Sequence, residues 1–138
     1  MKKIKLPAKM ENLEKLIDFI LEGVQDFTNI ADKKIINRLR LSCEEALVNV
    51  INYSYPQSEG EIEVSYDIDE KGAVHIEIID WGVPFDPLSK PAPDLDLPLE
   101  ERQIGGLGIY MILKIMDEVK YRRDEERNIL TMVKYKIN

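Results

Sequence analysis

The sequence predicts an α+β fold, a two-layer α/β sandwich in which helices pack on one face of a mixed, largely antiparallel sheet. Two observations predict it. Helical periodicity dominates the first 53 residues, and segments of alternating polar and apolar residues follow in pairs. Strands joined by short turns run antiparallel, and amphipathic helices bury their apolar faces against such a sheet.

The first part of the chain is predicted to form one strand and two helices. Residues 4–6 alternate between apolar and charged and indicate a short edge strand that ends at Pro7. Between residues 12 and 27, apolar residues recur at the spacing of one helical face. Asp32 can cap a second helix, which continues to about Tyr53.

Alternation of polar and apolar residues predicts two hairpins in the rest of the chain. In the first hairpin, the strands are residues 62–66 and 74–79, and the turn is residues 69–72. In the second, the strands are residues 119–122 and 129–137, and the turn is residues 123–128. The turn of the second hairpin is predicted from its run of charged residues.

A long loop and a short helix separate the two hairpins. Residues 84–103 hold five of the seven prolines and show no sustained helical or strand period. Loops of this length are uncommon in compact domains and are usually functional lids or disordered segments. We therefore expect a lid at about residues 84–104, followed by a helix from Gly108 to Met116.

Size, cysteine content and charge narrow the class of protein. A chain of 138 residues with 44% hydrophobic content matches a single domain, residues 1–138, that can bury a core. The lone Cys43 and lone His75 exclude a disulfide scaffold and most zinc sites. A formal charge of -7 argues against direct nucleic-acid binding. No apolar run reaches the roughly 20 residues that span a bilayer, so we expect a soluble, cytoplasmic protein with no membrane partner.

The second predicted helix carries the first candidate motif. Glu45 and Asn49 are four residues apart and share one face, and Asn52 follows three residues later on the same side. This spacing offers a general base and an oxygen ligand for a hard metal ion such as Mg²⁺. Glu44 is a less favoured candidate for the base, and an ordinary solvated helix face would show the same residue types.

The second motif follows the strand at residues 74–79. Asp80 ends an apolar strand, so its carboxylate needs a hydrogen-bond donor, and the exocyclic amino group of adenine would be suitable. Gly82 would let a flat ring approach the backbone closely. An Asp-Trp-Gly turn with no ligand is the alternative explanation.

The third motif is a glycine-rich segment at the start of a predicted helix. Gly105, Gly106 and Gly108, with Leu107 among them, lie where free N–H groups and the positive end of the helix dipole favour phosphate. Arg102, just before them, could meet a terminal phosphate. The chain lacks the sequence patterns of P-loop and Rossmann nucleotide sites.

In order and setting, these motifs resemble the ATP-binding domain shared by gyrase, Hsp90, histidine kinases and MutL, which has the Bergerat-type ATP-binding fold. Over nearly the whole chain, the sequence resembles the anti-sigma-factor serine kinases within this group. The resemblance implies the following roles: Glu45 as general base, Asn49 as Mg²⁺ ligand, Asp80 and Gly82 at adenine, and Arg102, Gly106 and Gly108 around the phosphates.

The same resemblance implies an ATP-dependent protein serine/threonine kinase, often dimeric, that phosphorylates a serine of an anti-anti-sigma factor and binds a sigma factor. A domain standing alone is expected to act on a separate protein. Two positions depart from the family pattern, because Tyr53 replaces a frequent His and Pro84 a frequent Gly. The alternatives are a non-catalytic interaction module whose bound nucleotide sets its partner surface, and a domain that has lost its nucleotide.

Overall fold

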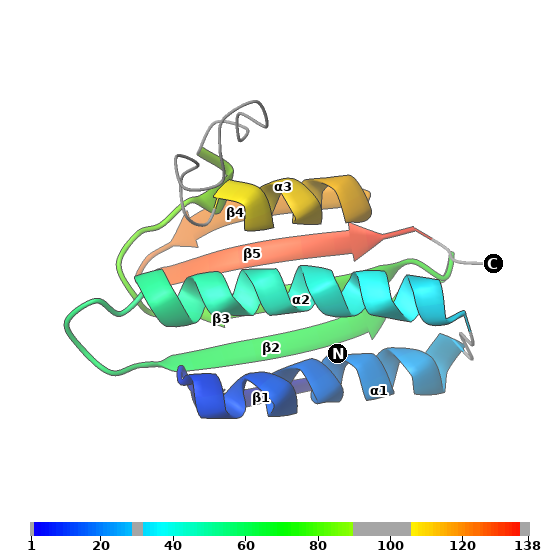
Figure 1. Cartoon of the computed structure of the whole chain (residues 1–138), viewed down its shortest axis with the longest axis horizontal. Helices are drawn as coiled ribbons and strands as arrows, with labels where there is room; N and C mark the ends of the chain where they lie inside the picture. Colours follow the sequence, from blue (N-terminus) through cyan, green and yellow to red (C-terminus); the bar gives the residue numbers. More distant parts are fainter. Residues whose placement is uncertain (1, 29–31, 90–105, 136–138) are drawn as a thin grey trace.

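The computed structural model describes residues 2–28, 32–89 and 106–135 (Figure 1). These residues contain a five-stranded sheet with the strand order β1-β2-β3-β5-β4. The strands are β1 (Lys2–Pro7), β2 (Glu61–Ile68), β3 (Val74–Asp80), β4 (Glu118–Asp124) and β5 (Arg127–Lys134). All four pairings between these strands are antiparallel, which confirms the predicted antiparallel character, while these strands contain no parallel pair of a mixed sheet.

Three α-helices cover one face of the sheet, as predicted (Figure 1). They are α1 (Leu13–Thr28), α2 (Lys33–Tyr53) and α3 (Gly106–Ile115). The cap predicted for α2 is confirmed, since the Asp32 side chain accepts a hydrogen bond from the Lys34 N–H at 2.9 Å. In the part of the chain that the structure describes, two short 3-10 helices, η1 (Met10–Asn12) and η2 (Pro87–Ser89), lie in connecting segments. No helix among the described residues is long and apolar enough to cross a membrane.

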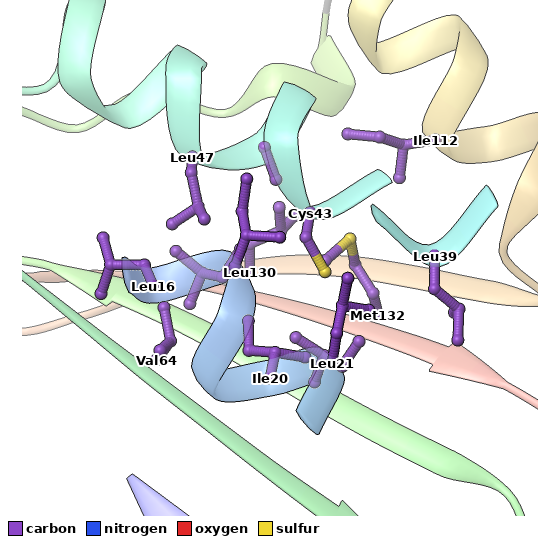
Figure 2. Packing of buried hydrophobic residues seen from close by; sticks show 14 of the residues in the cluster. Leu16, Ile20, Leu21, Leu39, Cys43, Leu47, Val64, Ile112, Leu130 and Met132 are labelled. Atoms are coloured by element: carbon purple, nitrogen blue, oxygen red, sulfur yellow. The ribbon is translucent and has the colours of Figure 1, made fainter. Parts of the chain in front are cut away.

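The core lies between the helices and the sheet (Figure 2). Every apolar position predicted for one face of α1 is buried: Leu13, Leu16, Ile17, Ile20, Leu21 and Val24. They pack with buried residues of α2 and α3, such as Leu47 and Ile112, and with strand residues such as Val64 and Met132. Each such side chain contributes roughly 1.5–3 kcal/mol when it is removed from water.

The first hairpin has the predicted turn. The Asp69 carboxylate accepts hydrogen bonds from the N–H groups of Lys71 and Ala73, each at 2.9 Å. Gly72 adopts a φ of 84°, a conformation that favours glycine. The turn therefore connects β2 to β3 with local hydrogen bonds of its own.

The predicted turn at residues 123–128 is wrong. β4 continues to Asp124 and β5 begins at Arg127, so only two residues connect the strands, and Glu125 takes a φ of 56°. Charged residues misled the prediction because β4 is an edge strand, where charged side chains can reach solvent while the backbone stays paired. The last predicted strand ends at Lys134, and residues 136–138 lie outside the described residues.

Four chain segments meet at one end of the sandwich: the end of α2, the end of β3, the start of β5 and the start of α3 (Figure 1). The expected lid begins at this end. Its residues 84–89 include η2, and residues 90–104 lie outside the described residues.

Candidate functional site

Asp80 is the most deeply placed charged residue of the candidate site, with 3% of its surface exposed. Its Oδ1 accepts hydrogen bonds from the Gly82 N–H and from the Asn128 side-chain amide, each at 2.9 Å. Burial raises the pKa of the Asp80 carboxyl, while hydrogen bonds from Asn128, Gly82 and Ser54 and the charge of Arg123 act in the opposite direction. The carboxylate thus lies in a poorly hydrated setting with several fixed donors around it.

Asn128 is a residue of the site that sequence reasoning missed. It begins the apolar part of β5 directly opposite Asp80 in the sheet register and is 4% exposed. Its amide group donates to Asp80 Oδ1 and, at 2.7 Å, to the Val83 carbonyl. Its Oδ1 accepts from the Tyr121 hydroxyl at 2.5 Å, and from the Phe85 N–H and Arg123 Nη1 at 3.3 Å each.

The signal for Asn128 was a polar residue at the start of an apolar strand. That signal could be used only with the correct hairpin boundaries, which place Asn128 in a strand paired with Asp80. The prediction of a turn at residues 123–128 hid both Asn128 and Arg123, whose Nη1 also donates to the Gly82 carbonyl at 2.9 Å.

Gly82 is needed for a reason that the sequence did not suggest. A Cβ atom at Gly82 would lie 2.0 Å from the backbone oxygen of Ser54, the residue that caps the C-terminus of α2. The same oxygen accepts a hydrogen bond from the Val83 N–H at 2.9 Å. The turn after β3 is therefore hydrogen-bonded to the end of α2, and Gly82 allows the two backbones to approach this closely.

Tyr55 supports the same turn from the other side. Its hydroxyl accepts a hydrogen bond from the Trp81 N–H at 2.8 Å and donates to the Glu61 carbonyl at 2.6 Å. Burial raises the pKa of the Tyr55 hydroxyl. The protonated hydroxyl can therefore serve both bonds at neutral pH.

Asn49 and Asp80 open into one pocket, although 31 residues separate them in the chain. Asn49 is 8% exposed and belongs to α2. Polar and apolar side chains both line the pocket; the lining consists of Ala46, Asn49, Val50, Ser54, Ile78, Asp80, Phe85, Pro87, Ile109, Tyr121, Asn128 and Leu130. The lining combines residue types found in small-molecule sites, but the cavity volume is about 20 Å³, so a flat ring could enter only if the lining residues move apart.

Glu45 lies beside this pocket and contacts the beginning of α3. A Cβ atom at Gly108 would lie 2.5 Å from Glu45 Oε2. Burial raises the pKa of the Glu45 carboxyl, and the neighbouring charge of Glu44 raises it further. Glu44 also acts electrostatically on Arg40.

The remaining predicted site residues are placed only in part. Asn52 is exposed and does not line the pocket, whereas Gly106 and Leu107 form the first turn of α3. Arg102 and Gly105 lie outside the described residues. Tyr53, the departure from the family pattern, stacks on Phe85 at the pocket with ring centres 5.5 Å apart.

The donor set limits how a metal ion could be held. Within residues 2–28, 32–89 and 106–135, no three His, Cys, Asp or Glu side chains gather as a metal site. Asn49 offers a hard oxygen at the pocket, which suits Mg²⁺ only if phosphates and water supply the other ligands. Asp80 offers an acceptor for an amino group, and the start of α3 offers the positive end of a helix dipole to an anion.

Comparison with known proteins agrees with this geometry. Residues 6–134 match the family model described as a histidine kinase-like ATPase domain. The chain is 32% identical over 136 residues to proteins named serine-protein kinase RsbW from Bacillus cereus strain AH187 and from Bacillus anthracis, covering 96% of this chain and 82% of each relative.

Two solved structures share the fold at low sequence identity. One is the histidine kinase domain of a blue-light activated histidine kinase from Erythrobacter litoralis, with a TM-score of 0.54 and 12% identity, and the chain spans 60% of its length. The other is the histidine kinase AdeS from Acinetobacter baumannii, with a TM-score of 0.53 and 14% identity, of which the chain spans 70%. These likenesses concern the fold alone.

Proposed function

The chain belongs to the histidine kinase-like ATPase family and, within it, to the group of the RsbW serine-protein kinases, and from this premise we propose that it is an ATP-dependent protein kinase. In this proposal ATP binds with its adenine at Asp80, and its γ-phosphoryl group passes to a serine of an anti-anti-sigma-type regulatory protein. A sigma factor is the second proposed protein partner, and a homodimer the proposed assembly.

One observation supports the nucleotide site above all others. Asp80 is a buried carboxylate that lines the pocket, and fixed protein donors hold it in place. A carboxylate has about four acceptor positions, and Gly82, Asn128 and Ser54 supply three donors. The adenine amino group would supply a further one, which offsets the cost of burying the charge.

The proposed transfer assigns the proton to Glu45. The serine hydroxyl oxygen of the partner attacks the γ-phosphorus, the bond from that phosphorus to the bridging oxygen breaks, and ADP leaves. Glu45 accepts the hydroxyl proton as the new bond forms. Its raised pKa brings this carboxylate closer to neutral pH, where a base can both exist ionised and take up a proton.

Two further parts of the chain would handle the phosphates. Asn49 offers an amide oxygen at the pocket, and we propose that it holds Mg²⁺, which would neutralise charge on the phosphates. The first turn of α3, from Gly106 to Gly108, presents N–H groups on the side of Glu45. Arg102 is proposed to meet the terminal phosphate.

The first experiment is calorimetric titration of the protein with ATP and with ADP, each with and without Mg²⁺. We expect saturable, Mg²⁺-dependent binding that weakens strongly in Asp80→Asn. The exposed substitution Asp26→Asn on α1 is the control and should leave binding unchanged. Absence of binding at millimolar nucleotide would overturn the proposal.

A second experiment separates a kinase from a non-catalytic binding module. The protein is incubated with ATP, Mg²⁺ and an anti-anti-sigma-type protein, and phosphorylation is followed by intact mass, with a Ser→Ala variant of the acceptor as control. Transfer by the wild type supports a kinase. ATP binding without transfer to any such partner would favour the non-catalytic module.

A further inference from the structure

Asn128 uses all of its hydrogen-bonding capacity inside the protein. Both N–H bonds of its amide are donated, one to Asp80 Oδ1 at 2.9 Å and one to the Val83 carbonyl at 2.7 Å. Its oxygen accepts from Tyr121, Phe85 and Arg123. A ligand in the pocket therefore cannot bond to Asn128 unless one of these bonds breaks.

The partners of Asn128 are the parts of the structure that shape the end of the pocket. Asp80 supplies the carboxylate, Val83 and Phe85 belong to the turn after β3, and Tyr121 lines the pocket from β4. The buried Asn128 side chain is thus hydrogen-bonded to the Asp80 carboxylate, to the turn after β3 and to β4. Its geometry is set by the backbone, because Asn128 and Asp80 are directly paired residues of β5 and β3.

We propose that Asn128 is a positioning residue of the nucleotide site, which orients the Asp80 carboxylate so that it accepts a hydrogen bond from the amino group of adenine. The inference rests on the proposed function, because it requires ATP to bind at Asp80. Asn128 acts through Asp80 and does not touch the nucleotide itself. With Gly82 it occupies Oδ1 of Asp80, which lines the pocket, and together with the Ser54 donor this leaves about one acceptor position of the carboxylate for a ligand.

The test compares two nucleotides that differ at a single group. Purine riboside 5′-triphosphate carries hydrogen where ATP carries the amino group, and the two share their ribose and triphosphate. A site that bonds this amino group prefers ATP, whereas contacts to the phosphates are the same for both. The ratio of the two dissociation constants therefore reports on the contacts made to the amino group.

We expect Asn128→Leu to weaken ATP binding about ten- to hundredfold, the range for loss of a hydrogen bond to a charged group. Binding of purine riboside 5′-triphosphate should change much less, so the preference for ATP collapses. A merely structural role would weaken both nucleotides equally, and that result would overturn the inference, as would unchanged ATP binding. If the wild type binds neither nucleotide, the proposed function fails as well.

Asn12→Leu is the matched control. Asn12 is also a buried asparagine, 8% exposed, whose side-chain amide donates to a backbone carbonyl, that of Pro7, at 2.9 Å. It does not line the pocket. Its substitution should lower the thermal stability without changing the preference for ATP, and a collapse of the preference in this variant would count against a specific role for Asn128.

Asn128→Asp keeps the size of the side chain and covers the case in which Asn128→Leu does not fold. At pH 8 it places a carboxylate oxygen beside Asp80 Oδ1, and the preference for ATP should be lost. As the pH is lowered, the two carboxyls can share one proton, which restores a bond between them and part of the preference. Among the described residues, the charge of Arg123 lowers the pKa of Asp80, and the charge of Asp80 in turn raises the pKa of Tyr55 and of Tyr121. A full preference for ATP at pH 8 would overturn the inference.

Discussion

The carboxylate of Glu45 lies directly against the main chain of Gly108, where a Cβ atom would be 2.5 Å from Glu45 Oε2. This contact joins α2 to α3 and brings together two motifs that are 63 residues apart in the chain. The proposed base and the glycine segment near the phosphates are thus in direct contact. Each constrains where the other can lie.

Gly108→Ala should therefore lower the rate of phosphoryl transfer without lowering the stability of the fold. The added methyl group meets the end of a flexible side chain, so Glu45 can turn aside, and alanine favours a helix over glycine by about 1 kcal/mol. We expect the melting temperature to stay the same or rise while phosphoryl transfer falls at least tenfold. Parallel thermal unfolding and transfer assays check this, and full activity in the variant would show that the position of Glu45 is not critical.

Glu45→Gln should leave ATP binding intact and slow transfer about 10²- to 10⁴-fold, the contribution typical of a general base. In the wild type, the transfer rate should fall as the pH decreases through the raised pKa of the Glu45 carboxyl, because only the ionised form accepts a proton. Single-turnover rates between pH 5 and 8 test both expectations. Glu44→Gln is the matched control, and a larger loss in that variant would move the base to Glu44.

Periodicity predicted those parts of the molecule that depend on local sequence. The apolar face of α1 and the cap at Asp32 follow from residues close together in the chain, and both are confirmed. Asp80 could be selected because it ends an apolar strand. Its position in a pocket with Asn49 agrees with the resemblance to ATP-binding domains.

The missed features depend on contacts between distant segments. Asn128 is important only because β5 pairs with β3 in a register that places it opposite Asp80. Gly82 is required by the Ser54 carbonyl at the end of α2, a neighbour that no spacing in the sequence indicates. Sheet register and the meeting of a helix end with a strand end arise from tertiary packing, so local patterns cannot reveal them.

Gly82→Ala should destabilise the protein, in contrast to Gly108→Ala. Its methyl group would meet the backbone of Ser54 at 2.0 Å, and backbone cannot turn aside as a side chain can. We expect a loss of about 1–3 kcal/mol in the free energy of unfolding, as for other overpacked sites. ATP affinity should fall too, because the turn that holds Asp80 must shift. Urea unfolding of the two alanine variants side by side tests the contrast; equal stabilities would contradict it.

The rate at which the Cys43 thiol reacts with a thiol reagent should report on nucleotide binding. The thiol is fully buried, and burial raises its pKa to about 12, so the native protein should react with a thiol reagent at pH 8 only when it opens. We expect labelling about a thousandfold slower than in urea. ATP with Mg²⁺ should slow it further, since a ligand of the native state lowers the open population. Rapid labelling without urea would contradict the buried position.

Asp80→Asn should weaken ATP binding without weakening the fold at neutral pH. Because burial raises the pKa of Asp80, the folded protein holds the proton more firmly than the unfolded chain does. The stability contributed by this carboxyl is therefore present at low pH and is lost as the pH rises from the pKa of the unfolded chain through the raised pKa of the folded protein.

Asparagine at position 80 keeps an acceptor for Gly82 and Asn128 but cannot ionise. The variant should thus gain stability relative to the wild type as the pH increases from about 3.5 to 7. Urea midpoints across this range measure the difference, with Asp26→Asn as control. A variant much less stable than the wild type at pH 7 would contradict this prediction, because it would show that the ionised carboxylate stabilises the fold.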